Sequence, residues 1–249
     1  MFIHNFNPVF LTLGFFELRF YGLVYFLSFL LIFFYLKRMV VMKKLILSLD
    51  QLYDLLFYLI LAVMLGGRLF YVLIYAPRYF FSHPLEVFAV WNGGMAFHGA
   101  LVGLIFALYF FTKKHKISFY SLADIIVIPA TIFLFFGRIA NFVNGELYGH
   151  ITNVPWAVKF PGVDGFRHPS QLYEALKNLF LFSFLFFKSR WSFKPGFLFW
   201  SFIFGYGSLR FSIEFFRFSP VYFASLSIGQ WLCVFMVIPS AYILFKNYL

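Results

Sequence analysis

The stretch Gly137-Arg138-Ile139-Ala140-Asn141-Phe142-Val143-Asn144-Gly145-Glu146-Leu147-Tyr148-Gly149 ends a long apolar run, residues 119–136. It places one arginine, two asparagines and one glutamate at the end of a segment that is long enough to cross a membrane. Charged side chains at membrane depth cost free energy, so their presence there indicates a functional site. We expect the rest of the chain to hold further polar groups opposite this stretch.

The composition indicates a membrane protein. Of the 249 residues, 63% are hydrophobic and only 12% are charged, whereas a soluble domain is about half apolar and a quarter charged. We therefore predict one polytopic membrane domain, 1–249. The net charge of +11 could suggest nucleic acid as a partner, but the placement of the lysines in loops favours a membrane and no nucleic acid. The single cysteine, Cys233, excludes an internal disulfide.

The apolar runs predict an all-α integral membrane protein with seven transmembrane helices, because a span needs about 20 apolar residues. The expected spans are residues 20–36, 52–75, 88–111, 119–142, 172–187, 196–211 and 226–245. Residues 1–18 are expected to form an outer interfacial arm. Residues 144–169, rich in proline and glycine, are expected to form an irregular outer loop segment. No basic region precedes the first apolar run, so we expect an uncleaved first span.

The loop lysines and arginines predict the orientation. Eleven lie on one side of the predicted bundle: Lys37, Arg38, Lys43, Lys44, Lys113, Lys114, Lys116, Lys188, Arg190, Lys194 and Lys246. Four lie on the other: Arg78, Lys159, Arg167 and Arg217. The C-terminus is therefore expected to be cytoplasmic, and with seven spans the N-terminus is expected outside.

Polar residues of different predicted helices fall at one depth. At a rise of about 1.5 Å per residue, the outer half contains Tyr21, Arg68, His98, Arg138, Arg210, Glu214 and Arg217. Separate helices have no reason to agree on depth unless their polar groups line one cavity. This agreement predicts a cationic pocket that opens toward the outer leaflet.

The spacing within the helices favours a phosphate ligand. Arg138 and Asn141 are three residues apart, and Glu214 lies between Arg210 and Arg217, so each set would share a helix face. Guanidinium groups bind phosphate bidentately, and a lipid head group supplies such a phosphate. The alternative is a structural ion pair of Arg138 or Arg210 with Glu146 or Glu214. We favour the functional interpretation because of the depth.

Two further positions remain open between function and structure. His98, within Gly93-Gly94-Met95-Ala96-Phe97-His98-Gly99, is either a general base or a histidine that is hydrogen-bonded inside the bundle. Arg68 either belongs to the site or extends outward to water.

Ser170 is a possible N-cap of the fifth span, whereas Gln171 and Glu174 could face the pocket. The other histidines have no metal-site spacing, and no nucleotide-binding glycine loop appears.

These motifs resemble the bacterial phosphatidylglycerol–prolipoprotein diacylglyceryl transferase family. The stretch Gly137–Gly149 is similar to the family signature at every constrained position. Supporting matches are Arg19-Phe20-Tyr21-Gly22, Gly67-Arg68, Gly93 to Gly99, His168-Pro169-Ser170-Gln171-Leu172-Tyr173-Glu174-Ala175, and Tyr206-Gly207 through Arg210, Glu214 and Arg217. Two positions depart from the family pattern: Phe20 stands where tryptophan is usual, and Ala100 where glycine is common.

The resemblance implies a reaction at the membrane surface. The family moves the diacylglyceryl group of phosphatidylglycerol to the lipobox cysteine in the signal peptide of a prolipoprotein. A thioether forms and glycerol phosphate leaves, in the first step of lipoprotein maturation. The resemblance also implies a location in the bacterial inner (plasma) membrane, with the active site toward the outer leaflet. No metal, nucleotide or other cofactor is expected, because the lipid carries its own leaving group.

We assign roles to the site residues on this basis. Arg138 and Arg210 would bind the phosphate and stabilise the charge that develops on it. His98 is the first candidate for taking the thiol proton, with Glu146 or Glu214 second. The residues expected to bind phosphatidylglycerol are Arg138, Asn141, Asn144, Tyr21, Tyr206, Arg217 and Arg68.

An anion or lipid transporter is the alternative function. It would share the cationic cavity, but alternating access would need polar residues through the inner half as well. There the sequence offers little beyond Asp124, so we favour the enzyme.

Overall fold

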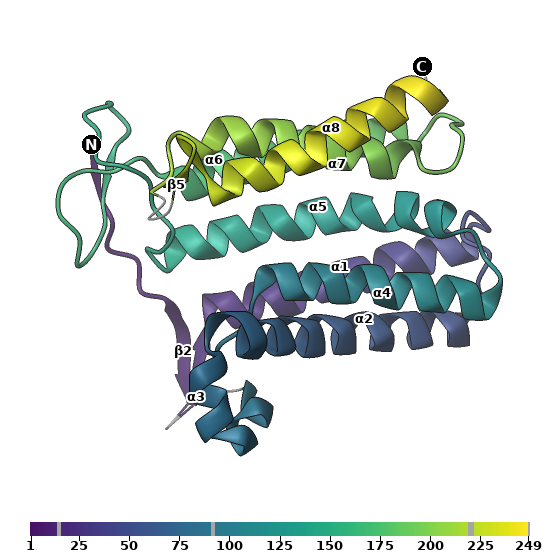
Figure 1. Ribbon diagram of the computed structural model, residues 1–249, viewed down its shortest axis with the longest axis horizontal. Coiled ribbons are helices and arrows are strands. Elements are labelled where there is room, and N and C mark those ends of the chain that lie inside the picture. Colours follow the sequence, from purple (N-terminus) through teal and green to yellow (C-terminus); the bar gives the residue numbers. More distant parts are fainter. Residues whose placement is uncertain (14–15, 91–92, 219–221, 249) are drawn as a thin grey trace. The chain divides into compact units, whose positions relative to one another are not determined.

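The computed structural model describes residues 1–13, 16–90, 93–218 and 222–248, and this part of the chain is mainly helical (Figure 1). The α-helices are α1 (Phe20–Val41), α2 (Leu49–Phe70), α3 (Pro77–Ser82), α4 (Phe97–His115), α5 (Phe119–Val143), α6 (Ser170–Lys188), α7 (Phe197–Glu214) and α8 (Ile228–Tyr248). The chain divides into two compact units, residues 1–35 with 124–249 and residues 36–123. Each unit is described by itself below.

The apolar helices identify a multi-pass membrane protein. Within the described residues, four helices are long and apolar enough to cross a membrane: Phe20–Val41, Leu49–Tyr75, Phe119–Val143 and Ile228–Tyr248. The helices α4, α6 and α7 are shorter, with 19, 19 and 18 residues, and each carries charged side chains, which in α4 lie in the last turn. The predicted all-α membrane class is confirmed, whereas the number of spans stays a prediction.

The third predicted span is wrong at its start. It was expected to begin at residue 88, but residues Pro84–Phe88 form the 3₁₀ helix η2, and α4 begins at Phe97. Gly93 and Gly94 have φ values of +80° and +74°, which an α-helix does not accommodate. The second predicted span continues past α2 as a π-helix, η1 (Tyr71–Tyr75). The other helices agree with the predicted spans to within a few residues at most ends.

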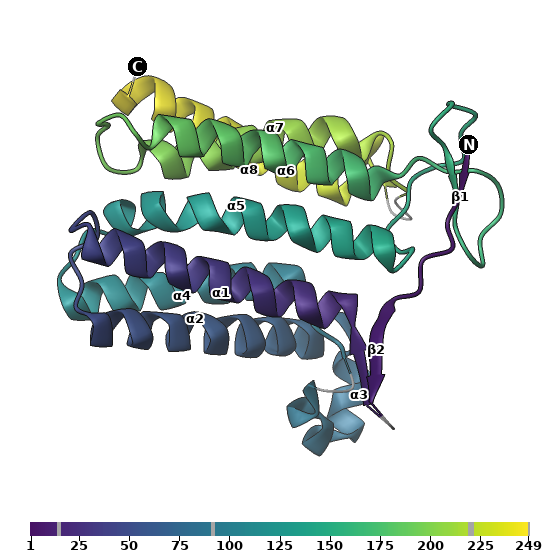
Figure 2. The same cartoon turned by 180° about the vertical axis from the view of Figure 1, so that it is seen from behind.

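The first unit packs α5, α6 and α7 around a buried apolar cluster. Val127 and Ile128 of α5 contact Leu185 of α6 and Leu198 of α7. Figures 1 and 2 show α6, α7 and α8 lying alongside one another. Asp124 of α5 caps the N-terminus of α7, accepting hydrogen bonds from the Gly196 and Phe199 amides at 2.7 Å each. Asp124 therefore has a structural role, as a cap for the first amides of α7.

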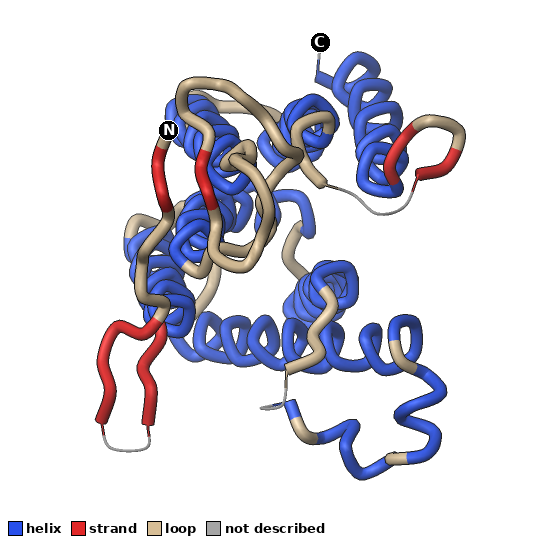
Figure 3. Tube along the Cα trace, turned by 90° about the vertical axis from the view of Figure 1, so that its left-hand side faces the viewer, coloured by secondary structure: helices blue, strands red, loops and turns tan. Residues whose placement is uncertain are grey.

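Short strands attach the N-terminal arm to the loop after α5 (Figure 3). Strand β1 (Phe2–Ile3) pairs in parallel with β4 (Val158–Lys159). The His4 ring is buried and its Nε2 lies 2.7 Å from the carbonyl oxygen of Phe142, near the end of α5. Strands β2 (Val9–Leu13) and β3 (Phe16–Arg19) form a hairpin, and β5 (Tyr222–Phe223) pairs with β6 (Leu226–Ser227). The arm therefore holds the end of α5 in place.

The second unit is built on the close approach of α2 and α4. A Cβ atom on Gly99 would lie 2.2 Å from the Gly66 carbonyl oxygen, and one on Gly103 would lie 2.4 Å from that of Ala62. Small residues four apart on both helices therefore let the two backbones touch, as in other membrane helix pairs.

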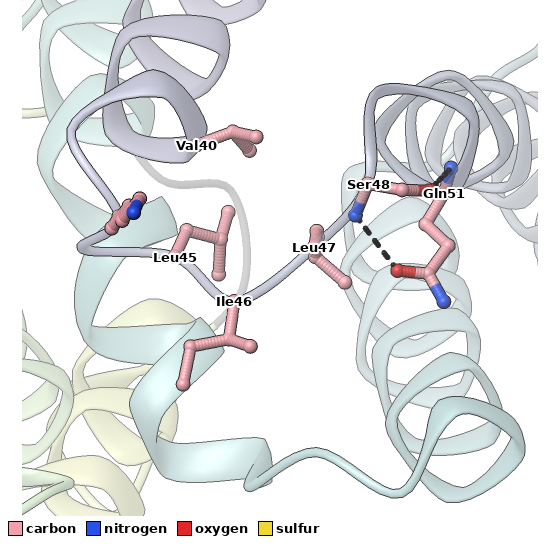
Figure 4. A pocket seen from close by; sticks show the side chains of 7 residues that line it. Val40, Leu45, Ile46, Leu47, Ser48 and Gln51 are labelled. Carbon is pink, nitrogen blue, oxygen red and sulfur yellow. Dashed lines mark hydrogen bonds between the residues drawn. The ribbon is translucent and has the colours of Figure 1, made fainter.

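A shallow groove precedes α2 in the second unit (Figure 4). Ser48 and Gln51 form a capping box there: the Ser48 amide donates to Gln51 Oε1 at 2.9 Å and the Gln51 amide donates to Ser48 Oγ at 3.1 Å. None of the predicted site residues lines this groove.

Candidate active site

A single buried glutamate, Glu174 of α6, is the centre of the charged site in the first unit. Its side chain is 1% exposed. Its Oε1 accepts hydrogen bonds from Nη1 of Arg210 and from Nη1 of Arg217, each at 2.7 Å. Its Oε2 lies 3.1 Å from Nε of Arg138. One carboxylate therefore brings together arginines from α5, from α7 and from the segment after α7.

Glu214 is the second carboxylate of this cluster. Its Oε2 lies 2.6 Å from Nη2 of Arg210 and 3.9 Å from Nε of Arg217. The expected approach of both arginines to Glu214 is therefore confirmed. However, α7 ends at Glu214, so Arg217 reaches the site from the following turn, where its amide donates to the Glu214 carbonyl oxygen. The predicted common helix face therefore does not extend to Arg217.

The end of the stretch Gly137–Gly149 is fixed against α6 and against the end of α7. Ser170 Oγ donates to the Leu147 carbonyl oxygen, and Gln171 Nε2 donates to that of Glu146. Gly149 pairs with Arg217, and a Cβ on Gly149 would lie 2.1 Å from the Phe216 carbonyl oxygen. Any larger residue at position 149 would displace the backbone that carries Arg217.

The prediction that Ser170 is the N-cap of the fifth span is wrong. Pro169 occupies the N-cap position of α6, without a side-chain cap, and the Ser170 hydroxyl bonds to Leu147 instead.

Asn141 links Arg138 to two other predicted site residues. Its Oδ1 lies 3.5 Å from Nη1 of Arg138. Its Nδ2 donates to Glu146 Oε1 at 2.8 Å and lies 3.5 Å from the Tyr21 hydroxyl. The Tyr21 hydroxyl in turn lies 3.1 Å from that of Tyr25. Arg138, Asn141, Glu146 and Tyr21 are therefore neighbours, as the sequence predicts, although Arg138 forms its ion pair with Glu174.

Tyr206 and Asn144 also lie in the first unit. The Tyr206 ring lies beneath the ammonium group of Lys177, with 3.7 Å between the nitrogen and the ring centroid. Asn144 Oδ1 is buried and has no hydrogen-bond partner within the described part of the chain.

The charges of the cluster do not cancel. Arg138, Arg210, Arg217 and Lys177 surround Glu174 and Glu214, so two positive charges remain. Buried charges are costly unless they are paired, so a cluster with this excess suits an anion of matching charge.

Arg68 belongs to the second unit and has a different environment. It is 5% exposed, so it does not extend outward to water. Its guanidinium donates to the carbonyl oxygens of Val87 at 2.9 Å and of Ala89 and Gly94 at 3.2 Å each. It also donates to the carbonyl oxygens of Glu86 and Gly93. Five backbone contacts fix the segment before α4.

His98, the predicted base, lies in the first turn of α4, and its side chain lies outside the described residues. The structure describes only the helical backbone there. The neighbouring Gly99 touches the Gly66 backbone, which fixes the position of this turn relative to α2.

The sequence did not decide whether Glu174 belongs to the site, although Glu174 is the centre of the charged cluster. The sequence did contain a signal for Glu174. A charged residue inside a predicted membrane span indicates a functional site, and this argument applies to Glu174 as it does to Arg138. However, Glu174 lies near the start of the predicted span, where a glutamate also has a structural explanation as part of the first turns of the helix. The pairing of one glutamate with three arginines depends on distant segments and could not be read from spacing.

His168, in the loop between α5 and α6, has a pKa that is lowered by burial and by the nearby charge of His150. Its Nδ1 lies 3.0 Å from the Tyr173 hydroxyl, which accepts a hydrogen bond from Trp156 Nε1 at 2.7 Å. The neutral ring therefore suits this position.

The apolar helices and the buried arginine–glutamate cluster define a multi-pass membrane protein with a cationic site. The sequence model of a family described as prolipoprotein diacylglyceryl transferase matches residues 8–246. The chain belongs to this family and is thus a transferase.

Individual relatives agree with this assignment. A phosphatidylglycerol–prolipoprotein diacylglyceryl transferase of Geobacter sulfurreducens is 48% identical over 85% of this chain and 82% of its own length. Relatives with the same name from Bordetella parapertussis and Polynucleobacter necessarius are 42% and 40% identical, each over more than nine-tenths of both chains. The alternative of an anion or lipid transporter finds no support in these relatives.

Proposed function

We propose that this protein transfers the diacylglyceryl group of phosphatidylglycerol to the lipobox cysteine of prolipoproteins, the first step of lipoprotein maturation. The observation that supports this most directly is the convergence of Arg138, Arg210 and Arg217 on one glutamate, with excess positive charge. Such a site suits the phosphate of a lipid head group. Family membership supplies the class of reaction.

The proposed reaction is a displacement at the glycerol carbon that bears the phosphate. The cysteine thiol loses its proton, and the sulfur forms a bond to that carbon. The carbon–oxygen bond breaks, and its electron pair leaves on the phosphate oxygen, which gives a thioether and glycerol phosphate. Arg138 and Arg210 would stabilise the negative charge that develops on the phosphate. No cofactor is expected, because the lipid carries its own leaving group.

A base must take the thiol proton, and His98 remains the first candidate. Between the two glutamates, Glu146 is now the better candidate. Glu146 is exposed and accepts one hydrogen bond from Asn141. Glu214 is buried, and its carboxylate is already occupied by Arg210 and by the Ser227 hydroxyl, so less of it is open to a substrate thiol.

The remaining predicted residues would bind and orient the lipid. Asn141 lies beside Arg138 and Tyr21, and Tyr206 lies against Lys177. Asn144 has a buried acceptor without a partner among the described residues, and Arg217 would share the phosphate with Arg210. Arg68 would instead hold the segment before α4 and would not contact the lipid, because backbone carbonyls occupy its guanidinium.

We further propose the topology predicted from the sequence. Seven helices would span the bacterial inner membrane, with the N-terminus outside, the C-terminus cytoplasmic and the site toward the outer leaflet. The chain would form one membrane domain, with residues 1–18 as an outer arm and residues 144–169 as an outer loop segment. The asymmetric distribution of loop lysines and arginines supports this orientation.

The test is transfer of labelled diacylglyceryl from phosphatidylglycerol to a lipobox peptide by the purified protein. We expect wild-type transfer that requires the peptide cysteine. Arg138→Ala should reduce transfer about a thousandfold, because it removes a charge that stabilises the leaving phosphate. Arg190→Ala, an exposed arginine after α6, is the control and should retain activity. A folded wild-type protein without transfer would refute the proposed function.

A further inference from the structure

Lys177 of α6 is a buried cation to which the proposed mechanism assigns no role. Its side chain is 2% exposed, and its ammonium nitrogen lies 3.6 Å from Oε2 of Glu174. The same nitrogen lies 3.7 Å from the centroid of the Tyr206 ring. The described residues offer this ammonium group no hydrogen-bond partner. It is thus held by charge and by the ring face alone.

Lys177 acts on the same carboxylate oxygen as Arg138. Oε2 of Glu174 lies 3.1 Å from Nε of Arg138 and 3.6 Å from Nζ of Lys177. The two cationic nitrogens are therefore less than about 7 Å apart, a distance at which charges in a buried site still interact strongly. Any anion that Arg138 binds would also be affected by the charge of Lys177.

The lysine changes the charge balance of the site. Without it, three arginines face two glutamates and a single positive charge is in excess; with it, the excess is two. The phosphodiester of phosphatidylglycerol carries one negative charge, whereas a released phosphomonoester carries up to two at neutral pH. A site with an excess of two therefore matches the leaving group better than it matches the substrate.

We propose that Lys177 is a positioning residue that acts through Glu174, and that it sets the affinity of the site for the phosphate group. By neutralising part of the Glu174 charge, it leaves the guanidinium groups of Arg138 and Arg210 available to the phosphate. This inference rests on the proposed function and goes beyond it, because it assigns the preference for the phosphomonoester to one residue.

The competing explanation is that Lys177 only stabilises the fold by offsetting Glu174. The two explanations differ in a measurable way. A structural lysine would change thermal stability but leave the binding of phosphate groups by the folded protein unchanged. A lysine that sets affinity would change the KM for phosphatidylglycerol, and would change inhibition by glycerol phosphate even more.

The experiment compares wild type with Lys177→Met and Lys177→Arg in the transfer assay, with glycerol phosphate as inhibitor. We expect Lys177→Met to raise the KM about tenfold and to weaken inhibition by glycerol phosphate further, on the order of thirtyfold, because that ligand carries more charge. Lys177→Arg keeps the charge and should stay within about threefold of wild type in both quantities.

Lys188→Met is the matched control. Lys188 lies on the same helix and also lies over an aromatic ring, that of Trp191, at 4.2 Å, but it is about three turns further along. It should not change either quantity. If Lys177→Met fails to fold, Lys177→Gln replaces it, since it keeps a polar end without the charge.

Two outcomes separate this inference from the proposed function. Absence of transfer by the folded wild-type protein would refute the proposed function itself. Normal wild-type transfer, with unchanged KM and unchanged inhibition in folded Lys177→Met, would overturn the role of Lys177 and leave the function intact.

Discussion

Two arginine sites in this protein, one partly exposed and one buried, use the same side chain for different purposes. In the first unit, Arg138, Arg210 and Arg217 share one carboxylate, that of Glu174. In the second unit, the hydrogen bonds that Arg68 donates within the described part of the chain all go to backbone carbonyls, those of Glu86, Val87, Ala89, Gly93 and Gly94. The position of an arginine along a predicted span therefore does not by itself distinguish an arginine of a charged cluster from one that holds a loop.

The difference lies in the partners. A guanidinium has five N–H donors, and the five carbonyl contacts of Arg68 use this capacity on the protein itself. In the first unit, four cations surround two glutamates, so charge and donors remain for an anion. We therefore expect changes at the first site to affect catalysis most, and changes at the second to affect stability most.

The largest expected effect is that of Glu174→Gln. This change leaves three arginines and one lysine with Glu214 as the only remaining carboxylate partner among the described residues. Breaking a buried ion pair costs about 3–5 kcal/mol, so the free energy of unfolding should fall by about that amount. Transfer should fall at least about a thousandfold, because the arginines lose their common anchor. Thermal unfolding and the transfer assay measure the two effects.

The control for this change is Glu17→Gln. Glu17 forms an ion pair with Arg19 at 3.0 Å, but both side chains are about half exposed or more. Exposed pairs contribute about 0–1 kcal/mol, so this variant should behave as wild type. Near-normal transfer by Glu174→Gln would show that the arginines do not depend on their shared carboxylate.

The next effect in size is that of Arg68→Lys. An ammonium group has three donors and no planar fork, so it cannot reach five carbonyls. We expect a loss of about 2–3 kcal/mol in the free energy of unfolding, with the KM for phosphatidylglycerol unchanged in the folded fraction. Arg78→Lys, at an exposed arginine of α3, is the control. A raised KM without a loss of stability would place Arg68 at the lipid instead of in the loop.

The smallest expected effect concerns pH and His168. Its folded-state pKa is lowered from 6.5 by burial and by His150. The folded state therefore prefers the neutral ring, and the stability that this ring contributes is present above pH 6.5 and is lost as the pH falls through the lower folded-state pKa. His168→Gln should flatten the acid side of a plot of thermal stability against pH, whereas His83→Gln, at an exposed position, should not. An unchanged acid side would contradict this role.

Much of the fold could be predicted because the bilayer imposes simple rules. Apolar length predicts helices, and the helices of residues 119–142 and 172–187 were found with nearly correct ends. The prediction failed before α4, where Pro84–Phe88 form the 3₁₀ helix η2 and Gly93 and Gly94 have positive φ values. Composition alone does not show the conformation of such glycines.

The sequence by itself determined the membrane class, the stretch Gly137–Gly149 and the neighbourhood of Arg138, Asn141 and Glu146, because periodicity, charge cost and local spacing are properties of a single segment. Only the tertiary structure decided that Glu174 joins three arginines, that Arg68 is occupied by carbonyls and that Lys177 lies over Tyr206. The physical reason is that pairing of charges depends on which distant segments pack together, and helical spacing within one segment does not specify that packing.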